Sequence, residues 1–282
     1  MQANKALFNG YIAVDWSAKG RPATGPNSIW IAIVDGPGQV QFLNPPTRRE
    51  AMNRIRELLD EATRVGRRLL CGFDFAFGYP EGTAQMMNAG DNWEAVWAVV
   101  ARLVTDQDNN RHGALQAAAD LNQHCHGEGP FWGINLPNDA PQALSRGMPH
   151  NRWGVNLPPY RRHFERVFPG QSVWQVSGPG AVGLQSLTGI ARLQDLRQQR
   201  EDLQVWPFET LGEGRRHVLA EIYPSLIPPS PGYEVRDRAQ VHAVAVRLSE
   251  MDEEGVLAPR LRIPVDMHEA VINEEALFLD IT

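Results

Sequence analysis

Apolar residues alternate with polar or small residues in several short stretches of the chain, and two of these stretches lead into an aspartate. Residues 11–15 (YIAVD) predict a strand with Asp15 at its carboxyl end, and residues 69–75 (LLCGFDF) predict a second strand that carries Asp74 near its end. Successive side chains of a strand point to opposite faces, so Asp74 continues the face of Gly72, where the missing side chain leaves space. If the strands are parallel neighbours, both carboxylates emerge at the edge where open α/β sheets bind ligands.

The remaining pattern predicts a mixed α/β sheet flanked by helices. Turn residues and short connections join the first three strands into an antiparallel meander, and the later strands are expected to be parallel. A helix over 47–66 opens on Thr47 and Glu50 at capping-box spacing, in which each side chain satisfies a free backbone N–H. The predicted strands cover 8–15, 28–35, 39–43, 69–75, 205–208, 218–224 and 276–281, and the other predicted helices cover 91–104, 114–123, 187–201 and 236–251.

Residues 81–203 differ from the rest of the chain because prolines, glycines and aromatic residues interrupt their helical stretches. A long loop-rich region inside a compact domain is usually functional or part of an insertion. We therefore predict a single domain over residues 1–282, in which residues 81–203 form an insertion or lid over one end of the sheet.

Two further acids are predicted to reach the same region as Asp15 and Asp74. Glu221 lies near the carboxyl end of its strand, and Asp237 shares the sheet-facing stripe of the 236–251 helix. Carboxylates packed close together cannot all ionise unless cations compensate them. Hard oxygen ligands suit Mg²⁺ or Mn²⁺, and two such ions can activate water and stabilise the leaving oxygen in phosphodiester cleavage. The four acids are therefore the predicted metal ligands and catalytic residues.

The order of these elements and acids resembles the RNase H-like superfamily. More closely, several stretches look like those of a group of predicted RNase H-like nucleases of unknown function: 14–17 (VDWS), 72–80 (GFDFAFGYP), 174–183 (WQVSGPGAVG), 221–224 (EIYP) and 237–241 (DRAQV). This resemblance implies a ribonuclease-H-like fold and a metal-dependent nuclease.

Substrate binding is assigned to two regions of the sequence. In a nuclease or phosphodiesterase, Arg161 and Arg162 of the insertion would grip phosphate, because arginine forks match phosphate oxygens. In the alternative, an ATP-dependent phosphotransferase of the actin and sugar-kinase type, the loop with Ser17 and Lys19 would cradle nucleotide phosphates. Asp74 would then act as general base on an acceptor hydroxyl. The chain shows one copy of the sheet pattern, whereas those kinases need two.

Each acid also has a purely structural interpretation. Asp15 and Asp74 could cap the turns after their strands, Asp237 could be a helix N-cap, and Glu221 could pair with a nearby arginine. If all four held such roles, the protein would be a non-catalytic binding module that retains the fold.

The composition of the chain limits the kinds of binding partner that we expect. With 43% hydrophobic and 21% charged residues, the 282-residue chain is typical of a soluble globular protein. A net charge of −6 argues against coating nucleic acid through bulk electrostatics, although a local basic groove is compatible with it. No apolar run approaches a bilayer span and no signal pattern opens the chain, so we predict a cytoplasmic protein without a membrane partner. A nucleic acid or a phosphorylated small molecule is the expected partner.

A cluster of potential soft ligands lies at His124, Cys125 and His126, with Glu128 close by. Zinc sites usually separate their ligand pairs by two to four residues and need a second pair, which this cluster lacks. The other cysteine, Cys71, falls inside a predicted strand and is expected to be a buried free thiol.

Overall fold

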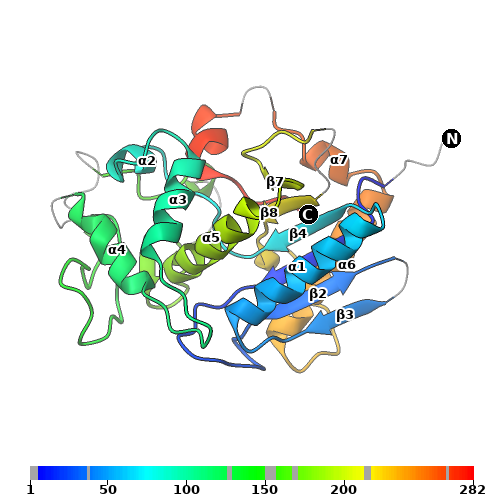
Figure 1. Ribbon diagram of the computed structural model, residues 1–282, viewed down its shortest axis with the longest axis horizontal. Coiled ribbons are helices and arrows are strands. Elements are labelled where there is room, and N and C mark those ends of the chain that lie inside the picture. Colours follow the sequence, from blue (N-terminus) through cyan, green and yellow to red (C-terminus); the bar gives the residue numbers. More distant parts are fainter. Residues whose placement is uncertain are drawn as a thin grey trace.

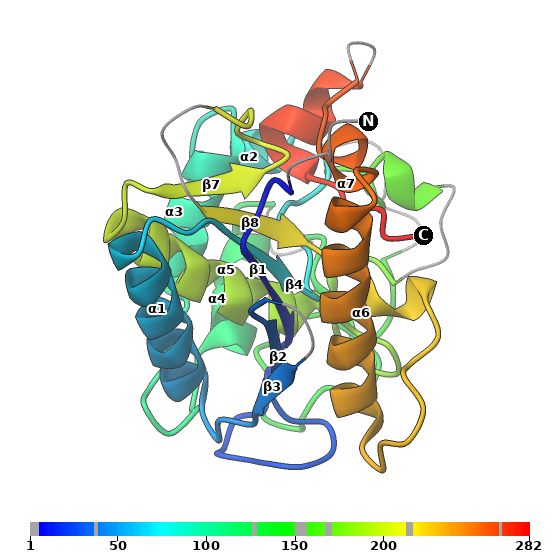
Figure 2. The same cartoon turned by 90° about the vertical axis from the view of Figure 1, so that its right-hand side faces the viewer.

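The computed structural model describes residues 6–36, 39–125, 129–149, 157–166, 171–212, 217–264 and 267–282. A six-stranded sheet with the strand order β3-β2-β1-β4-β8-β7 separates helices on its two faces (Figure 1, Figure 2). Its strands are β1 (Gly10–Asp15), β2 (Trp30–Val34), β3 (Val40–Leu43), β4 (Leu69–Phe73), β7 (Leu203–Trp206) and β8 (His217–Glu221).

The sheet is mixed, as the sequence predicted. β1, β2 and β3 form an antiparallel meander, while β1, β4, β8 and β7 are parallel to one another. Ala13 pairs with Gly72 and Val14 with Phe73, and the N–H of Asp74 donates to the carbonyl of Val14 at 3.2 Å. The carboxyl ends of β1 and β4 therefore lie side by side.

Alternation along the strands divides the core into two clusters. Ile12 and Val14 pack in one cluster with α1 (Arg48–Arg64) and α5 (Gly183–Gln198). Ala13 packs in the other cluster with α6 (Arg236–Glu253). Figure 2 shows α1 and α6 on opposite sides of the sheet. The parity of a strand residue thus decides which helical layer its side chain meets.

Part of the 81–203 stretch lies beside the sheet: α2, α3 and α4 are on the left of Figure 1, and α5 extends from them over the sheet towards α1. In this region α3 and α4 contact α5, and β5 pairs with β6 in a parallel two-stranded ladder. The region contains α2 (Thr83–Met86), α3 (Trp93–Leu103), α4 (Ala114–Gln123), β5 (Trp132–Gly133), η2 (Phe164–Arg166), β6 (Gln175–Ser177) and α5. The chain is completed by η3 (Pro224–Leu226), α7 (Leu257–Arg260) and the π-helical turn η4 (Val271–Glu275).

Several elements differ from the predictions at their ends: α5 begins at Gly183 rather than at residue 187, β7 covers 203–206 rather than 205–208, and β8 ends at Glu221 rather than at residue 224. Thr47 caps α1 by accepting the N–H of Glu50 at 3.1 Å, but the Glu50 carboxylate accepts the Thr47 hydroxyl, so only half of the predicted capping box is present. The helix predicted over 91–104 covers Trp93–Leu103, and its cap is Asn92, which accepts the N–H of Ala95. The stretch predicted as a strand over 276–281 makes one parallel bridge to β8 and is not a continuous strand.

Candidate functional site

Three of the four predicted acids gather around the carboxyl ends of β1 and β4. Asp15 is the last residue of β1, Asp74 directly follows β4, and Asp237 lies in the first turn of α6. One Asp74 oxygen accepts the N–H of Trp16 at 2.7 Å, and one Asp237 oxygen accepts the N–H of Asn27 at 2.5 Å. These bonds hold both carboxylates against the loop that leaves β1. Asp237 is helical, with Val235 as the N-cap residue of α6, so it is not the cap that one interpretation assigned to it.

The electrostatics of this cluster are unfavourable to ionised carboxylates. Burial, followed by the negative charge of Asp237, raises the pKa of Asp15 from 3.8 to about 7, although a hydrogen bond with Asp74 opposes the shift. Burial and the neighbouring Asp15 raise the pKa of Asp74 well above its ordinary value. Among the described residues, no arginine or lysine forms an ion pair with any of the three carboxylates. The fold therefore concentrates negative charge here without a basic side chain to balance it.

A cavity of about 460 Å³ opens beside Asp15 and Asp237. Ser17 and Lys19, predicted as substrate-binding residues, both line it. The Lys19 ammonium donates to the Pro26 carbonyl at 3.4 Å and is exposed. The remaining lining residues come from the loop after β1, from β6 and the turn behind it, and from the start of α5: Trp16, Ala18, Asn27, Ser28, Val176, Ser177, Gly178, Ala181, Leu184 and Gln185.

Glu221 has different partners from the other acids, although it lines one cavity together with Asp74. It pairs with Phe73 in the sheet, so its side chain shares the face of Phe73, whereas Asp74 follows the end of β4. Both Glu221 oxygens accept from Arg162 at 2.7 Å, and one also accepts the N–H of Phe77 at 2.9 Å. This is the ion pair that the structural interpretation of Glu221 anticipated.

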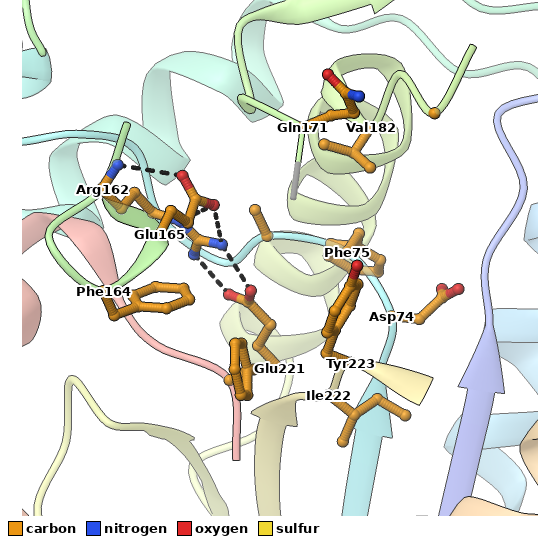
Figure 3. Close-up of a pocket in the computed structure, with 13 residues that line it drawn as sticks. Asp74, Phe75, Arg162, Phe164, Glu165, Gln171, Val182, Glu221, Ile222 and Tyr223 are labelled. Atoms are coloured by element: carbon orange, nitrogen blue, oxygen red, sulfur yellow. Dashed lines mark hydrogen bonds and ion pairs between the residues drawn. The ribbon is translucent and has the colours of Figure 1, made fainter. Parts of the chain in front are cut away.

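The predicted phosphate-gripping arginines are engaged with the protein. Arg162 is buried between Glu221 and Glu165, and these two carboxylates raise its pKa against the opposing effect of burial. Figure 3 shows this chain of ion pairs on one side of a second cavity, of about 380 Å³, with Asp74 on the other side of Tyr223. Arg161 donates to the Glu165 carbonyl at 3.0 Å. Neither arginine lines the cavity beside Asp15.

The donor set of the Asp cluster suits a hard divalent cation. Three carboxylates from separate elements, two of them with raised pKa values, offer oxygen ligands and an excess of negative charge. Their oxygen atoms are not all within 4.8 Å of one another, so the cluster is more open than a closed three-ligand site. It would suit a site that water or substrate oxygens complete, which is usual for Mg²⁺.

Several residues at the site carried no decisive signal in the sequence. Gln185 of α5 donates its side-chain amide to the Trp16 carbonyl at 2.9 Å and lines the same cavity as Asp15. Ser177 and Gly178 belong to the 174–183 stretch that supported the family resemblance, and they form another wall of this cavity.

Of the predicted soft-ligand cluster at residues 124–128, His126 and Glu128 lie outside the described residues.

Comparison of the chain with protein-family models, with curated proteins and with solved structures gives no match. Within the described ranges, no helix is both long and apolar enough to cross a bilayer.

Proposed function

We propose that this protein is a divalent-metal-dependent phosphodiester hydrolase, most simply a nuclease, with an RNase H-like fold. The fold assignment is supported by a three-strand antiparallel meander that continues into parallel strands. It is also supported by acids at the ends of the first and fourth strands and on a late helix, the arrangement that prompted the resemblance.

One observation carries the proposal. Asp15 and Asp74 lie next to each other, both partly buried, without a basic partner among the described residues, and the pKa values of both are raised. A purely structural pair of buried acids would be expected to have an arginine, as Glu221 has Arg162. An uncompensated carboxylate pair at the ligand-binding edge of an α/β sheet is instead typical of a functional site.

In this function Asp15 and Asp74 would be the main metal ligands, with Asp237 completing the set. Bound Mg²⁺ or Mn²⁺ would supply Lewis-acid activation of water and stabilisation of the leaving oxygen. Asp74 would be held in position by the Trp16 N–H, and Asp237 by the Asn27 N–H. Ser17 and Lys19 line the adjoining cavity, where a hydroxyl and an ammonium would contact the oxygens of a phosphodiester. Glu221 would take no part in metal binding, because Arg162 occupies both of its oxygens.

The test is calorimetric titration of Mn²⁺ and Mg²⁺ into the protein and into D15N, D74N and E221Q. We expect the unmodified protein and E221Q to bind the ions, and D15N and D74N not to bind them. Metal-dependent cleavage of single- or double-stranded DNA or RNA should be retained and lost in the same variants. Equal metal-dependent cleavage by D15N would refute the proposal. A parallel titration of ATP with Mg²⁺ separates the phosphotransferase alternative, for which nucleotide would bind much more tightly than the ion alone.

A further inference from the structure

A second group of potential metal ligands lies outside the Asp cluster. Glu81, His163 and His268 each offer one ligand atom, and these atoms lie within 4.8 Å of one another. No other set of three His, Cys, Asp or Glu side chains in the described parts of the chain meets this condition. The three residues come from distant parts of the sequence: the turn before α2, the residue before η2 and the segment before η4.

The ligand-bearing segments are held together by one buried carboxylate, that of Glu275. One of its oxygens accepts both the backbone N–H and Nδ1–H of His163, at 2.6 and 3.0 Å. Its other oxygen accepts the N–H of Glu81 at 2.9 Å. Glu275 is fully buried and lies seven residues after His268. The protein therefore positions this group through a carboxylate that cannot itself reach solvent.

The bond from Glu275 to His163 is characteristic of metal-binding histidines. When Nδ1–H donates to a carboxylate, the other ring nitrogen, Nε2, keeps its lone pair and points away from that carboxylate. Metal-ligating histidines usually have such a partner, which fixes the tautomer and increases the basicity of the ligand. His163 is thus prepared to bind a cation through Nε2.

His268 supplies the adjustable part of the group. Its ring stacks on that of His163 with centroids 3.7 Å apart, and its Nδ1 accepts the N–H of Ala270 at 3.2 Å. A neutral imidazole has one lone pair, so ligation by His268 would require its ring to turn and give up this bond. The side chains of His268 and Glu81 are exposed, and they can move to bring the ligand atoms to the roughly 2.0–2.2 Å from an ion that zinc requires.

We propose that Glu81, His163 and His268 form a binding site for a zinc-type divalent cation, separate from the Asp cluster. Two imidazoles and one carboxylate are a ligand set that suits Zn²⁺ and Co²⁺, whereas Mg²⁺ prefers oxygen ligands alone. A water molecule would complete the coordination, since the site is open to solvent. The ion would join the turn before α2 to the segments before η2 and η4. The segment before η2 also contains Arg162, and its guanidinium donates to the carbonyl of Glu275 in η4 at 3.0 Å. These two segments are therefore already joined without an ion.

The experiment is calorimetric titration of Zn²⁺ into the metal-free full chain, with Co²⁺ absorption spectra to report imidazole coordination. Loss of an outer-shell partner of a metal ligand typically weakens metal binding roughly 10–100-fold. Because E81Q and H268N each change a proposed ligand itself, we expect them to weaken Zn²⁺ binding by at least this factor. Both changes are at exposed side chains, so circular dichroism should show an unchanged fold even if H163N, which loses its bonds to Glu275, is destabilised. D15N should leave Zn²⁺ binding unchanged.

The matched control is H124N, because His124 is also exposed and belongs to the soft-ligand cluster identified in the sequence. The proposal is overturned if H124N abolishes Zn²⁺ binding, if D15N does so, or if E81Q and H268N bind Zn²⁺ as tightly as the unmodified protein. Loss of Mn²⁺ binding in D15N together with loss of Zn²⁺ binding in H268N would establish two independent sites.

Discussion

Replacing Asp15 by asparagine should stabilise the metal-free protein at neutral and alkaline pH. The side chain of asparagine has nearly the same shape as that of aspartate but cannot ionise. It therefore removes the cost of charging a partly buried carboxyl group beside Asp74 and Asp237. A substitution at a ligand-binding edge is thus expected to increase the free energy of unfolding while it removes metal binding, the trade-off common at functional sites.

The magnitude follows from the pKa of Asp15, which the folded protein raises from 3.8 to about 7. Between these values the folded state binds more protons than the unfolded chain, so the free energy of unfolding falls as the pH rises through this window. Each unit corresponds to about 1.4 kcal/mol, and the roughly three units set an upper limit of about 4 kcal/mol at pH 8. As the pH falls below about 4 the unfolded chain also becomes protonated at Asp15, so the difference should become small and then vanish. For a chain of this size, the limit corresponds to a rise in Tm of the order of 10 °C.

The assay is thermal and urea denaturation of both proteins in a chelator-containing buffer at pH 4 and pH 8. D139N is the matched control, because Asp139 is exposed and outside the cluster, and its effect should not depend on pH. Excess Mg²⁺ should stabilise the unmodified protein at pH 8 and have little effect on D15N. The reasoning is refuted if D15N and the unmodified protein differ equally at the two pH values, or if D15N is the less stable protein at pH 8.

Three further changes test the fold around the site by urea denaturation. R162M should cost about 3–5 kcal/mol, because it leaves buried carboxylates unpaired, and the added change E221Q should recover part of the loss. G72A should cost about 1–3 kcal/mol, because the new Cβ would lie 2.6 Å from Cγ2 of Ile222, and I222A should relieve it. T47A should cost about 0.5–2 kcal/mol through loss of the α1 cap, with no change in metal binding.

Much of the sheet could be predicted because its strands carry strong local signals. Alternation and turn residues located the meander, and the apolar run before Asp74 located β4. The limits of α1 were set by Thr47 and by the apolar stripe that now packs on the sheet. The strand predicted over 276–281 was wrong, because this stretch makes only one bridge to the sheet, at Glu221. How far it pairs depends on where β8 ends in the folded protein, and the local sequence does not contain that information.

The site was harder to predict, because the register between neighbouring strands decides which acidic side chains come together. Asp15, Asp74 and Glu221 all stand at carboxyl ends of neighbouring strands, which the sequence could indicate. Which face each side chain takes depends on the pairing of Phe73 with Glu221, and a shift of one residue would have reversed it. The sequence allowed Glu221 to pair with an arginine, but it did not indicate Arg162, because 59 residues separate the two along the chain.

The two groups of acids at this edge differ chiefly in what neutralises them. The fold supplies Glu221 with a buried guanidinium that satisfies both of its oxygens, and such a carboxylate has no capacity left for a metal ion. The fold supplies Asp15 and Asp74 with little more than a mutual hydrogen bond and one backbone N–H. Because uncompensated buried charge is costly, its retention needs a compensating ligand or a function. A divalent cation with a phosphodiester beside it would meet both requirements at Asp15 and Asp74, and neither requirement arises at Glu221.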